Sequence, residues 1–302
     1  MTGCAYRWHM NKKLWKAAAL ACALLVTPLT FAAGALGPPA LQARFTALGP
    51  ELASNPFGGP LVLKSEEASR RIDGEVFAVL DHPFPKVAAA LSDPGQWCSI
   101  LILHLNTKYC RREEGQGATV LDVRIGKKDP QALQSASKVA FRWRAPVLKA
   151  DYVAATLEAP EGPYDTRDYR LLAEAVPLDG NKTFLHMGYA LSHGAASELA
   201  MKLYLGTIAR DKLGFTRLDP SAGDAGYVGG MRGVVERNTM RYYLAIDAYL
   251  DSLAMPPAQQ LDRRLQAWFD ATEKYPRQLH EVDRDAYLRM KRDEVERQTA
   301  AR

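Results

Sequence analysis

The stretch LDHPFPKVAAALSDPGQW, residues 80–97, organises the chain on both sides of it. Before it, Gly74–Asp81 alternates two sets of side chains with a period of two, which predicts a strand. A proline-rich turn stops that strand. Lys86–Leu91 and Pro94–Ile100 then predict two short helices, with Ser92-Asp93 supplying cap residues between them. The stretch therefore indicates a strand followed at once by a pair of short helices.

Beyond this stretch the chain changes to segments that predict strands. In most of them apolar and polar side chains alternate with a period of two, and Gly, Pro, Asp and Asn mark the breaks between one segment and the next. Short hairpin-type turns, such as Asp179-Gly180-Asn181, join them and indicate an antiparallel meander. The six segments are Leu103–Arg111, Ala118–Gly126, Ser137–Arg144, Asp151–Ala159, Thr166–Val176 and Lys182–Ser192.

Helices are predicted for the remainder of the chain. Ala195–Leu213 is one, and Met231–Leu253 is a second with an apolar face. The link between them, Asp219–Gly230, is rich in glycine. Two amphipathic segments follow, Leu261–Lys274 and Asp283–Gln298, and their basic and acidic residues are nearly balanced.

This order of elements resembles the START-like (SRPBCC) superfamily, whose members include lipid-transfer domains, polyketide cyclases and plant proteins of the Bet v 1 type. The resemblance covers about Gly74 to Leu253, and residues 80–97 are its most specific part. It implies an α+β helix-grip fold, in which a curved antiparallel sheet of about seven strands surrounds a long C-terminal helix. It further implies a cavity between sheet and helix that holds one hydrophobic ligand. Side-chain packing decides whether that cavity is hollow.

The N-terminal residues predict export. Three lysines precede an apolar run, Ala17–Val26, and the small residues Ala32–Ala35 suit a signal peptidase. The run has roughly 10 residues, short of the ~20 that a membrane anchor requires. Cleavage after Ala32 and cleavage after Ala35 both remain open. We therefore expect a periplasmic protein.

The domain organisation follows from these assignments. We expect a signal peptide at residues 1–35, a lead-in segment with a short helix at 36–72, a START-like domain at 73–253 and a C-terminal helical tail at 254–302.

Charge argues against a nucleic-acid partner. The formal net charge is +5, but residues 1–33 contain four of the basic residues and no acidic ones. The remainder is almost neutral, whereas binding to phosphates requires an excess of clustered cations.

The cysteines that would remain after export are Cys98 and Cys110. In an oxidising compartment they predict a disulfide, worth roughly 3 kcal/mol by loop entropy. Two buried free thiols are the alternative. A metal site is disfavoured because no Cys-x-x-Cys and no paired histidine stands nearby.

Several strands contain arginines, and two interpretations stay open for Arg142 and Arg170. Either they lie on the solvent face of the sheet and form cross-strand ion pairs, or they point inward and hold an anionic head group. His186 lies on the opposite face of its strand from Leu185 and Met187. It is a candidate ligand-binding residue, and under the alternative that the protein is an enzyme it would be the acid or base.

The densest polar and aromatic stretch is Arg232–Tyr243. It is either an ordinary amphipathic helix or a helix that presents Glu236, Asn238 and Tyr242 to a ligand, with Gly229-Gly230 as a hinge.

The function expected is the binding, and transport or sequestration, of a hydrophobic small molecule or lipid in the periplasm. Transient membrane contact accompanies that hypothesis, no cofactor or metal is expected, and the oligomeric state stays open. One alternative is an enzyme of the cyclase or hydrolase type. Another is a protein that docks on an envelope partner, which an exposed stripe of Leu261, Leu265, Trp268 and Thr272 would favour.

Overall fold

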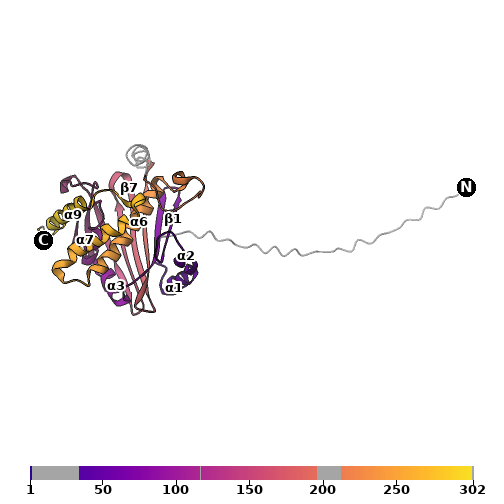
Figure 1. Ribbon diagram of the computed structural model, residues 1–302, viewed down its shortest axis with the longest axis horizontal. Helices are drawn as coiled ribbons and strands as arrows, with labels where there is room; N and C mark the ends of the chain where they lie inside the picture. Colours follow the sequence, from indigo (N-terminus) through magenta and orange to yellow (C-terminus); the bar gives the residue numbers. More distant parts are fainter. Residues whose placement is uncertain (2–33, 116, 196–211, 301–302) are drawn as a thin grey trace. The chain divides into compact units, whose positions relative to one another are not determined.

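The computed structural model describes the chain outside residues 2–33, 116, 196–211 and 301–302 (Figure 1). The predicted export signal, apart from its last residues, and most of the predicted helix Ala195–Leu213 lie outside the described residues. All elements below belong to one compact unit, Phe31–Arg302.

Eight strands form one antiparallel sheet in the order β1-β2-β8-β7-β6-β5-β4-β3. The fold class expected from the sequence is confirmed, with one strand more than predicted. That strand, β1, lies in the predicted lead-in segment. The strands are β1 (Leu61–Ala68), β2 (Arg71–Leu80), β3 (Thr107–Gly115), β4 (Ala118–Ile125), β5 (Ser137–Lys149), β6 (Tyr152–Glu161), β7 (Thr166–Leu178) and β8 (Lys182–His193).

Helices pack against both faces of this sheet. Two of them, α3 and α4, lie between β2 and β3 as predicted, and Asp93 caps α4 by accepting a hydrogen bond from the Gly95 amide at 2.7 Å. The helices are α1 (Pro38–Ala47), α2 (Gly49–Ala53), α3 (Phe84–Leu91), α4 (Pro94–Leu101), α6 (Gly230–Ser252), α7 (Pro257–Glu273), α8 (Pro276–Leu279) and α9 (Arg284–Ala300).

Strands β2 and β8 are buried along almost their whole length because helices cover both of their faces, whereas in β5 buried residues alternate with exposed ones. On the inner face, α6 packs against residues such as Val76 and Met187, in the main hydrophobic core. On the outer face, α1 packs against a second core that contains Phe77 and Phe184. Successive strand residues alternate between these two cores because strand side chains point to opposite faces.

The contact between α6 and β2 is close because Gly74 faces the helix. A β-carbon at Gly74 would lie 2.9 Å from Val235 Cγ1 and closer still to the Thr239 hydroxyl. Glycine therefore lets the long helix lie directly on the sheet.

The C-terminal helices pack on α6 and on β3. Leu265, Trp268 and Thr272 are buried, and Trp268 Nε1 donates to the Arg241 carbonyl of α6 at 3.1 Å. Leu261 is half-buried against the same core. The stripe that would have favoured partner docking is therefore covered by the protein's own helix α6.

The predicted disulfide is confirmed. Cys98 of α4 and Cys110 of β3 are bonded, with a Cα–Cα distance of 5.2 Å. Within the described residues, we find no helix with an apolar stretch of membrane-spanning length.

Candidate functional site

The inner face contains a histidine whose hydrogen bonds fix its tautomer. The Asn106 amide donates to His104 Nδ1 at 3.1 Å, so the other ring nitrogen carries the hydrogen and donates to Asn238 Oδ1 at 3.3 Å. Burial lowers the pKa of His104 well below its usual value, and the charges of Arg241 and Lys291 act in the same direction. His104 is therefore neutral at pH 7.

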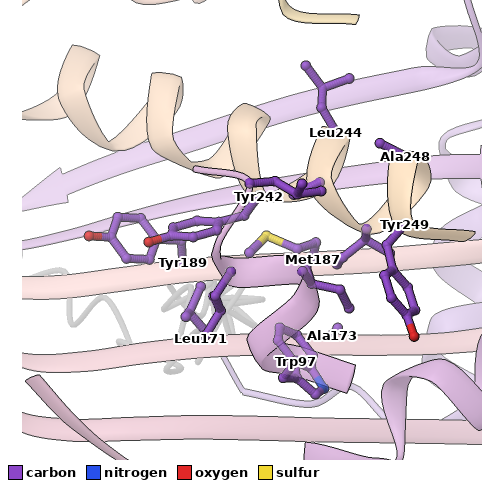
Figure 2. Packing of buried hydrophobic residues seen from close by; sticks show 14 of the residues in the cluster. Trp97, Leu171, Ala173, Met187, Tyr189, Tyr242, Leu244, Ala248 and Tyr249 are labelled. Atoms are coloured by element: carbon purple, nitrogen blue, oxygen red, sulfur yellow. The ribbon is translucent and has the colours of Figure 1, made fainter. Parts of the chain in front are cut away.

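A series of ring contacts extends from this histidine and begins with Tyr242. The Tyr242 ring lies 4.9 Å from that of His104 and 5.4 Å from that of Tyr189. Figure 2 shows the Tyr189 and Tyr242 hydroxyl groups next to each other, on the side away from Trp97 and Tyr249.

The same group extends across the sheet. The Tyr169 ring lies 6.2 Å from that of Tyr189 and 6.3 Å from that of Phe141, and its hydroxyl lies 2.7 Å from that of Thr166. We call the following residues the tyrosine cluster: His104, Phe141, Tyr169, Tyr189, Asn238 and Tyr242.

The polar groups of the tyrosine cluster are all uncharged. Burial raises the pKa of Tyr189 well above its ordinary value, although a hydrogen bond with Asn238 opposes the shift. Burial likewise raises the pKa of Tyr169 and of Tyr242. The phenols therefore keep their hydrogens and can donate them to a ligand, in an environment that is otherwise apolar.

Both arginines proposed as head-group ligands lie on the outer face. Arg142 is exposed, on the opposite side of β5 from Phe141 and Trp143. Arg170 of β7 lies 4.0 Å from the Glu158 carboxylate. Both positions agree with the interpretation that places these arginines on the solvent face of the sheet, where Arg170 has an ion-pair partner, and neither arginine reaches the tyrosine cluster.

His186 also points to the outer face, where it is buried beneath α1. Its Nδ1 lies 2.7 Å from Glu174 Oε1 and its Nε2 lies 3.0 Å from Glu75 Oε1. Burial alone would lower the pKa of His186, but the hydrogen bonds to Glu174 and Glu75 outweigh it and raise the pKa. Phe77 stacks on the ring at 4.4 Å. His186 therefore serves as a charged bridge between two carboxylates, away from the inner face.

Glu236 is fully buried and anchors neighbouring backbone. Its carboxylate accepts hydrogen bonds from the Ser65 hydroxyl of β1 and from the amides of Phe215 and Thr216, the last at 2.9 Å. It holds together the edge strand, α6 and the segment that precedes the glycine-rich link.

Of the residues proposed from the sequence, the structure brings together Asn238 and Tyr242. Sequence reasoning did not find their partners Tyr189 and His104, which come from β8 and from the turn after α4. The alternation that places Tyr189 on the same face as Met187 was the available signal.

Surface hollows lie away from the tyrosine cluster. Two adjoin the edge strand β1, with volumes of about 270 Å³ and 450 Å³, and Leu63 and Thr216 line both. A third, of about 670 Å³, lies beside α9 and is lined by charged residues that include Asp293 and Arg297. In the part of the chain that the structure describes, no three His, Cys, Asp or Glu side chains form a metal site.

Neither a protein-family model nor a curated protein matches this chain. The solved structures that are similar to it include the following three. Ara h 8.0201 is 14% identical with a TM-score of 0.35, over 60% of this chain and 99% of that one. Human StAR-related lipid transfer protein 5 is 10% identical with a TM-score of 0.36, over 71% and 98%. A protein from Arthrobacter aurescens is 14% identical with a TM-score of 0.31, over 62% and 91%.

These similarities concern architecture alone. The helix-grip architecture rests on this structure itself: on the strand order, on α3 and α4 between β2 and β3, and on α6 against the inner face.

Proposed function

We propose that this protein binds a hydrophobic small molecule or lipid between α6 and the inner face of the sheet, and carries or sequesters it in the periplasm. The observation that supports the proposal is the tyrosine cluster. It collects uncharged hydrogen-bonding groups on a face that is otherwise lined by Leu171, Met187 and similar apolar side chains.

The chemistry of the tyrosine cluster selects the class of ligand. Tyr189 and Tyr242 supply neutral donors, and His104 is neutral as well. An anionic head group would lose its hydration there and meet only neutral donors from the tyrosine cluster, because the nearby Arg241 and Lys291 already pair with Glu281 and Glu294. We therefore expect an apolar body with one uncharged acceptor, such as a hydroxyl or carbonyl oxygen.

Affinity would come mainly from the ligand's apolar surface. Burial contributes about 25 cal/mol per Å² before the costs of ordering and of displacing side chains are deducted. Because side chains of α6 and the sheet pack between the two layers, ligand entry requires α6 or the segment before it to move (Figure 2).

Fluorescence titration with two matched probes tests the proposal. We expect 1-pyrenebutanol, which carries a hydroxyl, to bind saturably and more tightly than the anionic 1-pyrenebutyrate. Replacing Tyr242 by Phe removes one donor and should weaken pyrenebutanol binding about fivefold, the equivalent of one ordinary hydrogen bond.

Tyr249→Phe is the control, because Tyr249 lies on the same helix and its hydroxyl donates instead to Gln96 at 2.9 Å. If neither probe bound saturably, the proposal would be contradicted. Equal weakening by both substitutions would contradict the role of the tyrosine cluster.

A further inference from the structure

The segment before α1 is attached to the outer face of the sheet through its own backbone. The amide nitrogen of Leu36 lies 2.8 Å from Glu174 Oε1, and that of Gly37 lies 3.2 Å from Glu174 Oε2. Both carboxylate oxygens of Glu174 are thus directed at the chain where α1 begins.

Glu174 belongs to a buried network that carries an excess of negative charge. It accepts hydrogen bonds from Tyr152 at 2.6 Å and from His186 at 2.7 Å, and His186 also contacts Glu75. Glu174 and His186 have no exposed surface. Two carboxylates and one imidazolium together carry a net negative charge, which is unfavourable in a buried site.

Cationic side chains on neighbouring elements are engaged elsewhere. Arg44 of α1 lies over the Phe77 ring at 5.6 Å, and Lys64 of β1 pairs with Glu51 at 3.2 Å. Among the described residues, the partners of the Glu174 carboxylate are Leu36, Gly37, Tyr152 and His186.

We infer that signal peptidase cleaves the Ala35–Leu36 bond, and that Glu174 binds the new α-ammonium group of Leu36. The sequence Ala33-Gly34-Ala35 has the small-x-small spacing that the peptidase requires before this bond. Cleavage converts the Leu36 nitrogen from an amide into a cation at the position where it already contacts Glu174. The buried network of two carboxylates, one imidazolium and one ammonium is then neutral.

Cleavage after Ala32 would not have this effect. Three residues would remain in front of Leu36, whose nitrogen would stay an uncharged amide. The inference rests on the predicted export signal and is independent of the proposed ligand.

N-terminal sequencing tests the cleavage site. The full chain, with its own export signal, is produced in a bacterium and recovered from the periplasm. We expect a single N-terminus at Leu36. An N-terminus at Ala33, or an unprocessed chain, would overturn the inference.

Chemical denaturation tests the ammonium contact. The chain that begins at Leu36 is compared with one that begins at Ala35, which keeps the Leu36 nitrogen as an amide donor. A charged hydrogen bond is stronger than a neutral one, so we expect the unfolding equilibrium constant of the Leu36 chain to be about tenfold smaller at pH 7. The difference should disappear when both chains carry Glu174→Gln.

The pH dependence gives a second readout if Glu174→Gln does not fold. An α-amino group ordinarily titrates at about 7.7–8.0, and contact with Glu174 favours its charged form. The extra stability of the Leu36 chain should be fully present below that pH, and it should be lost as the pH rises above it. The titratable groups of the network around this amine are Glu174, Tyr152, His186 and Glu75, and the cations Arg44 and Lys64 lie on neighbouring elements. Equal stability of the two chains at pH 7 would overturn the ammonium contact.

Discussion

His104 and His186 are both buried, yet their pKa values shift in opposite directions. His104 faces an asparagine and nearby cations, so burial keeps it neutral. His186 lies between two carboxylates, which stabilise its charged form against the cost of burial. The protein thus keeps the described polar groups of the tyrosine cluster neutral and places this charged network on the outer face. That separation is the residue-level basis for expecting an uncharged ligand group.

A third histidine, His82, leads us to expect that the stability of the protein depends on pH. Hydrogen bonds to Asp247 and Asp251 of α6 raise the pKa of His82 to about 9, against the opposing effect of burial. A raised pKa means that the stabilisation is complete below the unfolded value of about 6.5 and is lost as the pH rises through 9.

We therefore expect His82→Gln to lower the free energy of unfolding by about 1 kcal/mol at pH 6, a value that allows for solvent screening of the half-exposed carboxylates. Denaturation at pH 6, 8 and 10 should show the gap between wild type and variant closing at the highest pH. A stability difference that stays constant with pH would show that it does not come from the charged form of His82.

At the scale of elements, the contact between α6 and β2 depends on Gly74. Gly74→Ala places a methyl group against Val235 and Thr239, and should lower the free energy of unfolding by about 1–3 kcal/mol. Thr239→Ala removes the nearest atom, so the double variant should be more stable than the sum of the single effects predicts. Urea denaturation of the four chains measures the coupling, and strictly additive effects would show that the two residues do not meet.

Helix α9 is held to β3 by a buried ion network. Glu294 contacts Lys108 at 3.0 Å and Lys291 at 2.8 Å, and Lys291 also donates to the carbonyl groups of His104 and Thr107. The network therefore supports the turn that positions His104.

Glu294→Gln leaves both lysines without their shared carboxylate and should cost about 3–5 kcal/mol of stability. The exposed Glu296 lies on the same helix, and Glu296→Gln should have almost no effect. Thermal denaturation and proteolysis of α9 measure both variants; equal sensitivity would show that the network contributes little.

Each of these elements can be predicted from the sequence only as far as its residues show a regular alternation of apolar and polar side chains. The five strands β4 to β8 alternate regularly between turns, and their predicted starts agree with the structure to within one residue. Strand β1 lies at the sheet edge, and the polar run Lys64-Ser65-Glu66-Glu67 hides its alternation. Leu103 and Leu105 flank His104 like strand residues, but the backbone there forms turns, so β3 begins only at Thr107.

The candidate site was predictable only in part for a related reason. Asn238 and Tyr242 are four residues apart on one helix, and that spacing is visible in the sequence. Their contacts with Tyr189 and His104 depend on the position of α6 across the sheet, which no local pattern encodes.

At the scale of the whole molecule, one antiparallel sheet packs against the long helix α6, and α7 packs on α6 in turn. Helix α6 covers the stripe of α7 that could have docked on a partner, and the Cys98–Cys110 disulfide ties α4 to β3. The inner face between α6 and the sheet is the region where apolar surface and neutral donors coincide. The central claim is therefore that this region accepts an apolar molecule.

Native mass spectrometry of the protein purified from periplasm, followed by solvent extraction, tests that claim most directly. We predict one molecule of an apolar compound with an uncharged polar group per protein chain, and a reduced occupancy in Tyr242→Phe but not in Tyr249→Phe. A protein that carries no bound molecule, and that stays unchanged in mass when neutral lipids are offered, would contradict the claim.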